Sequence, residues 1–337
     1  MNKQALQSWL NTPRNIAITT HHKPDGDALG SSLALYNVLK AQGHEVAVIS
    51  PSEYPQFLMW LPGEDSIIRF SDNPKEAANK MLHAEAIFCL DFNALSRINH
   101  LEQFVRLNKN AIKILIDHHL EPEDFAQYVW SDTSVSSTCE LLLQFFREMN
   151  YENYITADVA DCLYTGLVTD TGRFKYAMSP NVLQSAAYLL EKGADIGRIN
   201  DEIYDSYSEN RLRFLGYCLN NRLEVMPEYA TAIIAIPAQI FKDFDHQTGD
   251  SEGLVNYPLG IKNIKFAALI TENEGMVKLS LRSKGDFSVN DFARQHFEGG
   301  GHKNAAGGRS KDLNLAQVVQ KFKDLLPQYA EQLNNNS

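Results

Sequence analysis

Four polar, aspartate-bearing segments in this chain each follow an apolar run, and together they constrain both the fold and the chemistry. They are His21–Asp27, Asp91, Asp117–His119 and Asp170–Gly172, in that order. Carboxylates and imidazoles are costly to bury unless a partner compensates them. Strand ends that bring Asp and His side chains to one edge of a sheet are a common way to hold two divalent cations. We therefore expect these segments to meet at one metal site.

Short apolar runs in the first half of the chain predict a parallel sheet. The segment 28–42 has apolar residues at helical spacing and lies between two predicted strands, 15–20 and 45–50. The continuous apolar runs 86–90 and 112–116 suit strands that are buried on both faces. In open α/β sheets ligands gather beyond the carboxyl ends of the strands. The acidic residues that follow these runs are thus placed where a site is expected.

The remainder of the chain predicts more helices and a second domain. Helices are predicted at 135–150, 157–168, 181–192 and near 315–333, and strands at 231–236, 264–271 and 276–282. The charged and aromatic segment 201–223 is predicted to be a helical connector between the domains, and the glycine-rich stretch 299–308 follows the last of these strands. The predicted fold is α/β, with an N-terminal parallel-sheet domain covered by helices on both faces, a helical linker and a smaller α+β domain. The expected limits are 1–190, 191–225 and 226–333.

Composition narrows the class of protein. The 337 residues carry a formal net charge of -11, which is poorly suited to binding long nucleic acid through its phosphates. A small polyanionic substrate is still compatible, because bound metals would reverse the charge locally. The four cysteines are far apart in sequence and have apolar neighbours, so we expect them to be reduced core residues of a cytoplasmic protein. Neither a signal peptide nor a membrane-spanning segment is predicted.

The candidate ligands exceed what one metal ion needs. They are His21, Asp25, Asp27, Asp91, Asp117, His118 and Asp170. Two sites that share a bridging carboxylate would use them well, and mixed imidazole and carboxylate ligation favours Mn²⁺, with Mg²⁺, Co²⁺ or Zn²⁺ as alternatives. Each residue alone has a simpler interpretation. The sequence around Asp25 is compatible with a turn, Asp27 with a helix cap, and Asp91 with a cap or turn at a strand end.

These motifs, in this order, resemble those of the DHH phosphoesterase superfamily. Residues 21–31 resemble its first motif, and Asp91, Asp117–His119 and Asp170 resemble the second, third and fourth. The stretch 299–308 resembles the signature of the DHH-associated domain. Within the superfamily, the two-domain layout is similar to the bacterial nanoRNase and pAp phosphatase group.

The resemblance implies roles for individual residues. It implies one metal on His21 and Asp25, a second on Asp27, His118 and Asp170, and Asp91 as the bridge. Asp117, next to a ligating histidine, would fix the tautomer of that histidine. His119 would contact the scissile phosphate or protonate the leaving oxygen, the alternative being a structural hydrogen bond to a neighbouring ligand. The implied substrate contacts are Arg282, Ser283, Gly300, Gly301 and His302, through a guanidinium, exposed backbone N–H groups and an imidazole.

The implied activity is metal-dependent hydrolysis of short oligoribonucleotides to nucleoside 5′-monophosphates and of pAp to AMP. Close alternatives are hydrolysis of linear or cyclic di-AMP, or of polyphosphate. A non-catalytic nucleotide or metal sensor on the same fold belongs to a different class, and the complete ligand set argues against it. We expect small nucleotides as partners and neither long nucleic acid nor a membrane, with a homodimer left open.

Overall fold

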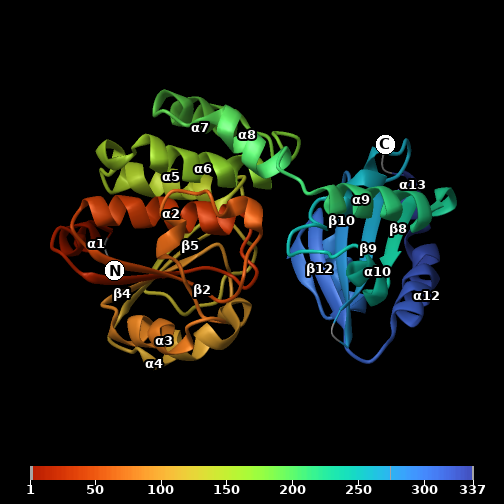
Figure 1. The fold of residues 1–337 in the computed structure, drawn as a ribbon, viewed down its shortest axis with the longest axis horizontal. Coiled ribbons are helices and arrows are strands. Elements are labelled where there is room, and N and C mark those ends of the chain that lie inside the picture. The colour runs from red at the N-terminus through yellow and green to blue at the C-terminus, as the bar shows by residue number, and fades with distance from the viewer. Residues whose placement is uncertain (1–2, 274, 336–337) are drawn as a thin grey trace. The chain divides into compact units, whose positions relative to one another are not determined.

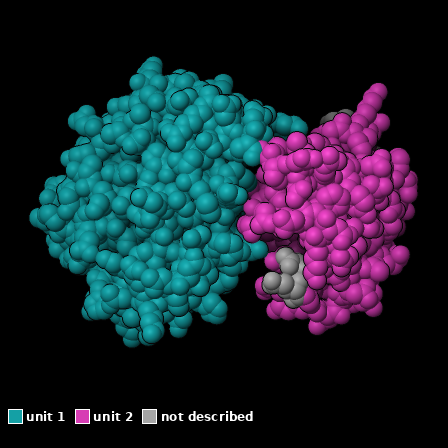
Figure 2. Space-filling view, in the orientation of Figure 1, with its two compact units in different colours: residues 1–206 teal, residues 207–337 magenta. Residues whose placement is uncertain are grey.

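The computed structural model describes residues 3–273 and 275–335, which fall into two compact units. Unit 1 is Met1–Ser206 and unit 2 is Tyr207–Ser337 (Figure 2). This division lies inside the segment 191–225, which the sequence predicts as a linker. The limits of the catalytic and substrate-binding domains, 1–190 and 226–333, stay a prediction. In the part of the chain that is described, no helix has both the length and the apolar character needed to cross a membrane.

Unit 1 is built on a six-stranded sheet in which all neighbouring strands are parallel. The strands are β1 (Asn15–Thr19), β2 (Glu45–Ser50), β3 (Ile68–Arg69), β4 (Ala86–Leu90), β5 (Ile112–Asp117) and β6 (Tyr128–Ser131). The helices are α1 (Lys3–Leu10), α2 (Gly26–Ala41), α3 (Pro74–His83), α4 (Glu102–Leu107), α5 (Thr138–Glu148), α6 (Ala157–Asp170), α7 (Pro180–Glu191) and α8 (Ile196–Tyr204).

Helices cover both faces of this sheet, as the sequence predicts, with α2, α5 and α6 on one face and α3 and α4 on the other (Figure 1). Successive residues of β4 point to opposite faces. Phe88 and Leu90 therefore enter the core under α2, α5 and α6, whereas Ile87 and Cys89 enter the core over α3 and α4. Burial on both faces explains why the strand is a continuous apolar run.

The strand order β3-β2-β1-β4-β5-β6 reverses direction beside β1. The chain leaves β1 toward β2 and β3 and then returns to the other side of β1 to form β4. The connections after β1 and β4 therefore diverge, and a crevice opens between them at the carboxyl edge of the sheet. This crevice lies where the sequence places its acidic segments.

Helices α2 and α6 pack closely at the level of this crevice because glycines line their contact. An added Cβ on Gly30, in α2, would lie 2.4 Å from the carbonyl oxygen of Cys162, and one on Gly166, in α6, would lie 2.6 Å from Asp27 Oδ1. Side chains at these positions would force the helices apart. The two glycines therefore allow the start of α2 and the end of α6 to come together.

Unit 2 is a mixed six-stranded sheet with the order β11-β12-β10-β9-β8-β7, in which only β8 and β9 pair in parallel among the described strands. Its strands are β7 (Leu223–Met226), β8 (Thr231–Ile236), β9 (Phe266–Asn273), β10 (Met276–Ser283), β11 (Gly300–His302) and β12 (Ala305–Ser310). Its helices are α9 (Glu209–Asn221), α10 (Ala238–Asp243), α11 (Val289–His296), α12 (Leu315–Leu325) and α13 (Ala330–Asn335) (Figure 1).

The predicted connector helix differs from the sequence-based expectation. The segment 201–223 is not one continuous helix, because α8 ends at Tyr204 and α9 begins at Glu209, where the Ser208 hydroxyl accepts a hydrogen bond from the Arg211 N–H. A serine that caps in this way satisfies an N–H group that the first turn of a helix leaves unpaired. Helix α8 packs in the core of unit 1 and α9 in a core of unit 2, so the segment contributes one helix to each unit.

Candidate metal centre

The loop after β1 brings the first acidic residues to the crevice. Pro24 keeps the loop out of a helical conformation, and α2 then starts at Gly26 with Asp25 as its cap. Asp25 Oδ1 accepts from the N–H groups of Asp27 and Ala28, both at 3.1 Å. The capping role that the sequence allowed for Asp27 therefore belongs to Asp25. The carboxylate of Asp27, in the first turn of α2, is fully buried.

The loops after β4 and β5 bring the next residues to the same edge. Asp91 directly follows β4, is 2% exposed and has a left-handed backbone with φ 63°. This conformation is uncommon for a residue with a side chain, although Asp tolerates it better than most. Asp117 ends β5, and His118 and His119 follow it. Strained backbone conformations concentrate at functional sites, and here the strain lies at the predicted bridging residue.

His21, Asp25 and Asp91 form the first cluster. His21 Nε2 lies 3.4 Å from Asp91 Oδ2 and 3.9 Å from Asp25 Oδ1. The other ring nitrogen of His21, Nδ1, lies 3.0 Å from the carbonyl oxygen of His22. Because a carbonyl only accepts, Nδ1 carries a proton in this contact. When the ring is neutral, its Nε2 lone pair therefore points toward the carboxylates. That is the tautomer a metal ligand needs.

His118 forms the second cluster with three carboxylates. Its Nε2 lies 3.4 Å from Asp170 Oδ2, 3.6 Å from Asp91 Oδ1 and 3.9 Å from Asp27 Oδ2. Asp170 is the last residue of α6, as the sequence predicts. A carboxylate at the C-terminal end of a helix opposes the helix dipole, which adds to the need for a cation.

Asp91 belongs to both clusters through different oxygen atoms. Its Oδ2 faces His21 and its Oδ1 faces His118. Most of these separations exceed hydrogen-bond length. Two ligands held about 2.1 Å from one cation lie about 3.0–3.4 Å apart at octahedral and tetrahedral angles, so a small contraction would bring each cluster to metal-binding distances.

The electrostatics of the site also fit cations. Burial, followed by the charges of Asp91 and Asp25, raises the pKa of Asp27 well above its ordinary value. Burial opposes protonation of His21, but the carboxylates of Asp25 and Asp91 outweigh it and raise its pKa to about 10. Burial lowers the pKa of His118. Without cations, protons must therefore offset the charge of the crowded carboxylates, and divalent cations would do so directly.

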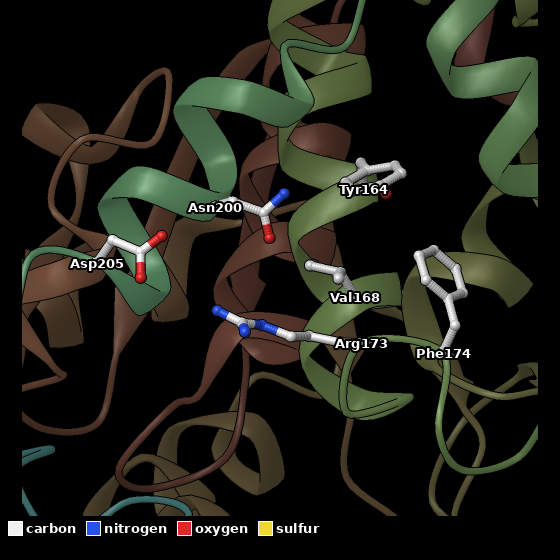
Figure 3. Close-up of a pocket in the computed structure, with 6 residues that line it drawn as sticks. All are labelled: Tyr164, Val168, Arg173, Phe174, Asn200 and Asp205. Carbon is white, nitrogen blue, oxygen red and sulfur yellow. The ribbon is translucent and has the colours of Figure 1, made fainter.

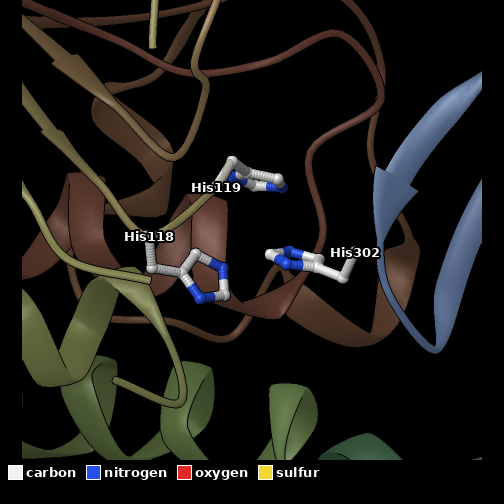
Figure 4. Close-up of side chains that lie close together, drawn as sticks. All are labelled: His118, His119 and His302. Atoms are coloured by element: carbon white, nitrogen blue, oxygen red, sulfur yellow. The ribbon is translucent and has the colours of Figure 1, made fainter. Parts of the chain in front are cut away.

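Asp117 and His119 form a pair beside the clusters. Asp117 is fully buried, and its Oδ1 lies 2.7 Å from His119 Nδ1. His119 Nδ1 also lies 3.7 Å from Asp91 Oδ1. The rings of His118 and His119 lie next to each other with their centroids 4.8 Å apart (Figure 4). Asp117 thus holds Nδ1 of His119 as a donor, and His119 sits against the residue shared by the two clusters.

The start of α5 also belongs to the centre, and the sequence-based prediction missed it. The N–H groups of Thr138 and Cys139 donate to Asp27 Oδ2 and Oδ1 at 2.6 and 2.9 Å. The Thr138 hydroxyl donates to Asp91 Oδ1 at 2.9 Å. The only local signal is the run Ser136-Ser137-Thr138, which is typical of a helix N-cap and does not show that its partners are carboxylates far away in the sequence.

The predicted substrate contacts all lie in unit 2, around one hairpin. Arg282 is in β10, and its side chain donates to the carbonyl oxygen of Leu281. The buried Ser283 hydroxyl donates to the carbonyl oxygen of Phe287 and accepts from the Asn304 amide. The glycine-rich stretch forms the hairpin of β11 and β12, which contains Gly300, Gly301 and His302.

The Gly301 amide differs from the expectation of an exposed donor, because it donates to Asn290 Oδ1 at 2.9 Å. An added Cβ on this residue would lie 2.5 Å from the carbonyl oxygen of Ala305, across the hairpin. Gly301 is therefore needed for the close approach of the two strands.

A separate cavity of about 340 Å³ in unit 1 contains none of the predicted ligands (Figure 3). It is lined by Tyr164, Val168, Arg173, Phe174, Asn200 and Asp205. One wall is the Arg173 guanidinium, which lies over the Tyr204 ring at 3.7 Å. A single carboxylate and no imidazole line the cavity, so the chemistry belongs to the clusters described above.

Two family models match the chain in sequence order. The DHH family N-terminal domain matches residues 15–167, and the DHHA1 domain matches residues 229–332. A bifunctional oligoribonuclease and PAP phosphatase, NrnA, from Thermus thermophilus is 31% identical, over 91% of this chain and 87% of its own length. The Bacillus subtilis protein of the same name is 24% identical, over 90% of this chain and 92% of its own length.

Other relatives carry different names. The Bacillus subtilis cyclic-di-AMP phosphodiesterase GdpP is 25% identical over 97% of this chain, which spans 50% of that longer protein. The crystal structure of an exopolyphosphatase-related protein from Bacteroides fragilis is 40% identical, with a TM-score of 0.92, over 98% of this chain and 96% of its own. The RecJ structure with Mn²⁺ from Thermus thermophilus shares the fold, with 15% identity and a TM-score of 0.54, over 97% of this chain and 54% of its own.

Proposed function

The chain belongs to the DHH family, and from this premise we propose that it is a two-metal phosphoesterase that hydrolyses short oligoribonucleotides to nucleoside 5′-monophosphates and pAp to AMP and phosphate. The observation that carries the proposal is the position of Asp91, whose two oxygens face two different histidine clusters. A carboxylate in that position can bridge two cations. The relatives named oligoribonuclease and PAP phosphatase support the substrate class.

Two divalent cations are the proposed cofactors. His21, Asp25 and Asp91 would hold one, and Asp27, Asp91, His118 and Asp170 the other. Mixed imidazole and carboxylate donors favour Mn²⁺ and also accept Mg²⁺, Co²⁺ or Zn²⁺. When bound, such cations polarise a phosphate and make water a stronger nucleophile at neutral pH.

His119 is the proposed proton donor to the leaving oxygen. Its Nδ1 is held by Asp117, so the Nε2 atom is the one that would exchange a proton with the substrate. Asp117 would then orient His119 and would not react itself.

Arg282 is the proposed contact for a terminal phosphate of the substrate, because its planar guanidinium can bind two phosphate oxygens at once. Gly300 and His302 would add donors from the neighbouring hairpin. Such a contact would favour substrates that end in a phosphate, as pAp does. Ser283 would support this region indirectly, because its hydroxyl already bonds Phe287 and Asn304.

Hydrolysis of linear or cyclic di-AMP or of polyphosphate is the alternative, and the similarity to the cyclic-di-AMP phosphodiesterase and to the exopolyphosphatase-related protein favours it. The test is turnover of short oligoribonucleotides with and without adenine, pAp, pApA (which is linear di-AMP), cyclic di-AMP and polyphosphate by the same preparation with Mn²⁺. We expect the highest kcat/KM on pAp and on the short oligoribonucleotides, whatever their bases. A higher value on cyclic di-AMP or polyphosphate, or turnover of pApA without turnover of the other oligoribonucleotides, would replace the proposed function, and binding without product release would indicate a sensor.

The remaining expectations concern the setting of the protein. All four cysteines are free and buried, which fits the proposed cytoplasmic location. The net charge of -11 fits small nucleotides as substrates and disfavours long nucleic acid. Whether the chain forms a homodimer is left open, and sedimentation analysis of the purified chain decides it.

A further inference from the structure

Thr138 donates two hydrogen bonds into the metal centre, to two different carboxylates. Its backbone N–H donates to Asp27 Oδ2 at 2.6 Å and its hydroxyl to Asp91 Oδ1 at 2.9 Å. All three side chains are at most 2% exposed. Thr138 has no other donor, so its whole donor capacity is used on these two residues.

Both oxygen atoms that Thr138 contacts belong to the second cluster. Asp91 Oδ1 and Asp27 Oδ2 are the atoms that face His118, at 3.6 and 3.9 Å. The Asp91 oxygen that faces His21 is Oδ2, which Thr138 does not contact. The contacts of Thr138 are therefore selective for one of the two clusters.

The segment that carries Thr138 is held in place by its own hydrogen bonds. The Ser137 hydroxyl accepts from the Glu140 N–H at 3.1 Å and caps α5. The buried Glu140 carboxylate accepts from both the N–H and the hydroxyl of Ser136, each at 2.7 Å. These bonds fix the backbone on both sides of Thr138, so its hydroxyl has a defined direction.

We infer that Thr138 is a positioning residue for the second cation site. A carboxylate oxygen has two lone pairs, and a hydroxyl that occupies one of them on Asp91 Oδ1 holds that oxygen in place and leaves its other lone pair for a cation. Hydrogen bonds of this kind to metal ligands are worth about 10- to 100-fold in metal affinity. This inference rests on the proposed function only in requiring that both clusters bind cations.

The direct test is the substitution Thr138→Val, followed by calorimetric titration of the metal-free chain with Mn²⁺. Valine keeps the branched shape and the backbone N–H, and hence the bond to Asp27, and removes only the hydroxyl. We expect the wild type to bind two ions. In the variant, one ion should bind with unchanged affinity and the other about 10- to 100-fold more weakly. Thr138→Ser should restore most of the loss.

Thr165→Val is the matched control. Thr165 is also fully buried in unit 1, and in the described part of the chain its hydroxyl has no hydrogen-bond partner. The same chemical change there should leave both Mn²⁺ affinities unchanged. Thermal unfolding of each metal-free variant checks that the fold survives, so that a general loss of structure is not mistaken for a loss at one site.

Each outcome decides the inference. Two unchanged affinities in Thr138→Val, or an equal loss at both sites, would overturn it, as would a wild type that binds fewer than two Mn²⁺ ions. If the wild type binds two ions but hydrolyses neither pApA nor pAp, the proposed function fails. A selective loss in the variant would still support the role of Thr138, because the titration does not depend on turnover.

Discussion

Replacing Gly166 with alanine should damage the metal centre although Gly166 is not itself a ligand. Gly166 lies in α6 directly beside Asp27, and an added Cβ would be 2.6 Å from Asp27 Oδ1 and 2.3 Å from Cys139 Sγ. Ordinary contacts of a Cβ begin at 3.4 Å. The Asp27 oxygen would therefore have to move by about 0.8 Å, the difference between 3.4 and 2.6 Å. The Cys139 side chain would also have to shift.

A displacement of this size has a predictable effect. Moving a group of the site by about 1 Å costs about 100-fold in turnover, so we expect a loss of kcat of that order together with weaker Mn²⁺ binding at the second cluster. The fold should survive, because overpacking a core costs about 1–3 kcal/mol and an alanine recovers about 1 kcal/mol of helix propensity.

The assay combines calorimetric Mn²⁺ titration with turnover of pApA, and Gly216→Ala is its control. Gly216 is exposed in α9, and no atom lies within 4 Å of an added Cβ. That variant should keep both Mn²⁺ affinities and gain slightly in stability. If Gly166→Ala binds two ions as the wild type does and turns over at the wild-type rate, the reasoning about the contact between α6 and Asp27 is wrong.

Three further predictions concern single residues of the site. Asp91→Asn keeps the shape of the side chain but should lower kcat by roughly 10³-fold or more, which is about 4 kcal/mol in activation free energy. The circular dichroism spectrum should be unchanged, and turnover within tenfold of the wild type would exclude a bridging role. Arg282→Ala should raise KM about 10- to 100-fold, from the loss of a charged hydrogen bond, while calorimetry still shows two bound Mn²⁺ ions; equal losses of substrate and metal affinity would contradict a phosphate contact. The pKa of His21 is raised to about 10, so its ring is protonated at neutral pH. Mn²⁺ binding must then release that proton, and at pH values below the pKa the Mn²⁺ affinity should increase about tenfold for each unit that the pH rises. Calorimetry in buffers of different ionisation enthalpy measures the proton, and no release would refute the assignment.

The sequence predicts the parts of the fold and of the site that depend on local pattern. Asp91 and Asp117 follow short runs that are apolar because β4 and β5 are buried on both faces. Asp170 ends an apolar helix in the structure, as expected. Parallel strands carry their carboxyl ends to one edge, so the convergence of Asp91 and Asp117 follows from the strand assignment alone.

The contacts that orient the ligands could not be predicted in the same way. Thr138 lies in a run that is typical of a helix N-cap, and its hydrogen-bond partner Asp91 is 47 residues away. In the sequence, Gly166 is only a glycine inside a predicted helix. Its importance comes from its contact with Asp27, which belongs to another helix. Both cases depend on tertiary packing between elements, which the local pattern does not specify.

The short strands also escaped prediction for a physical reason. β3 has two residues, and β11 consists of glycines and a histidine with weak strand propensity. Pairing with a longer neighbour, β2 or β12, establishes them. The break between α8 and α9 is similar, because the Ser208 cap competes with continuation of the helix only once each helix has a core to pack against.

The central claim is that two cations share Asp91, and anomalous diffraction from crystals of the chain grown with Mn²⁺ tests it most directly. We predict two manganese peaks, each about 2.2 Å from a different oxygen of Asp91 and roughly 3.5–4 Å from each other, one beside His21 and the other beside His118. A single peak, or peaks that leave either Asp91 oxygen without a metal, would contradict the account.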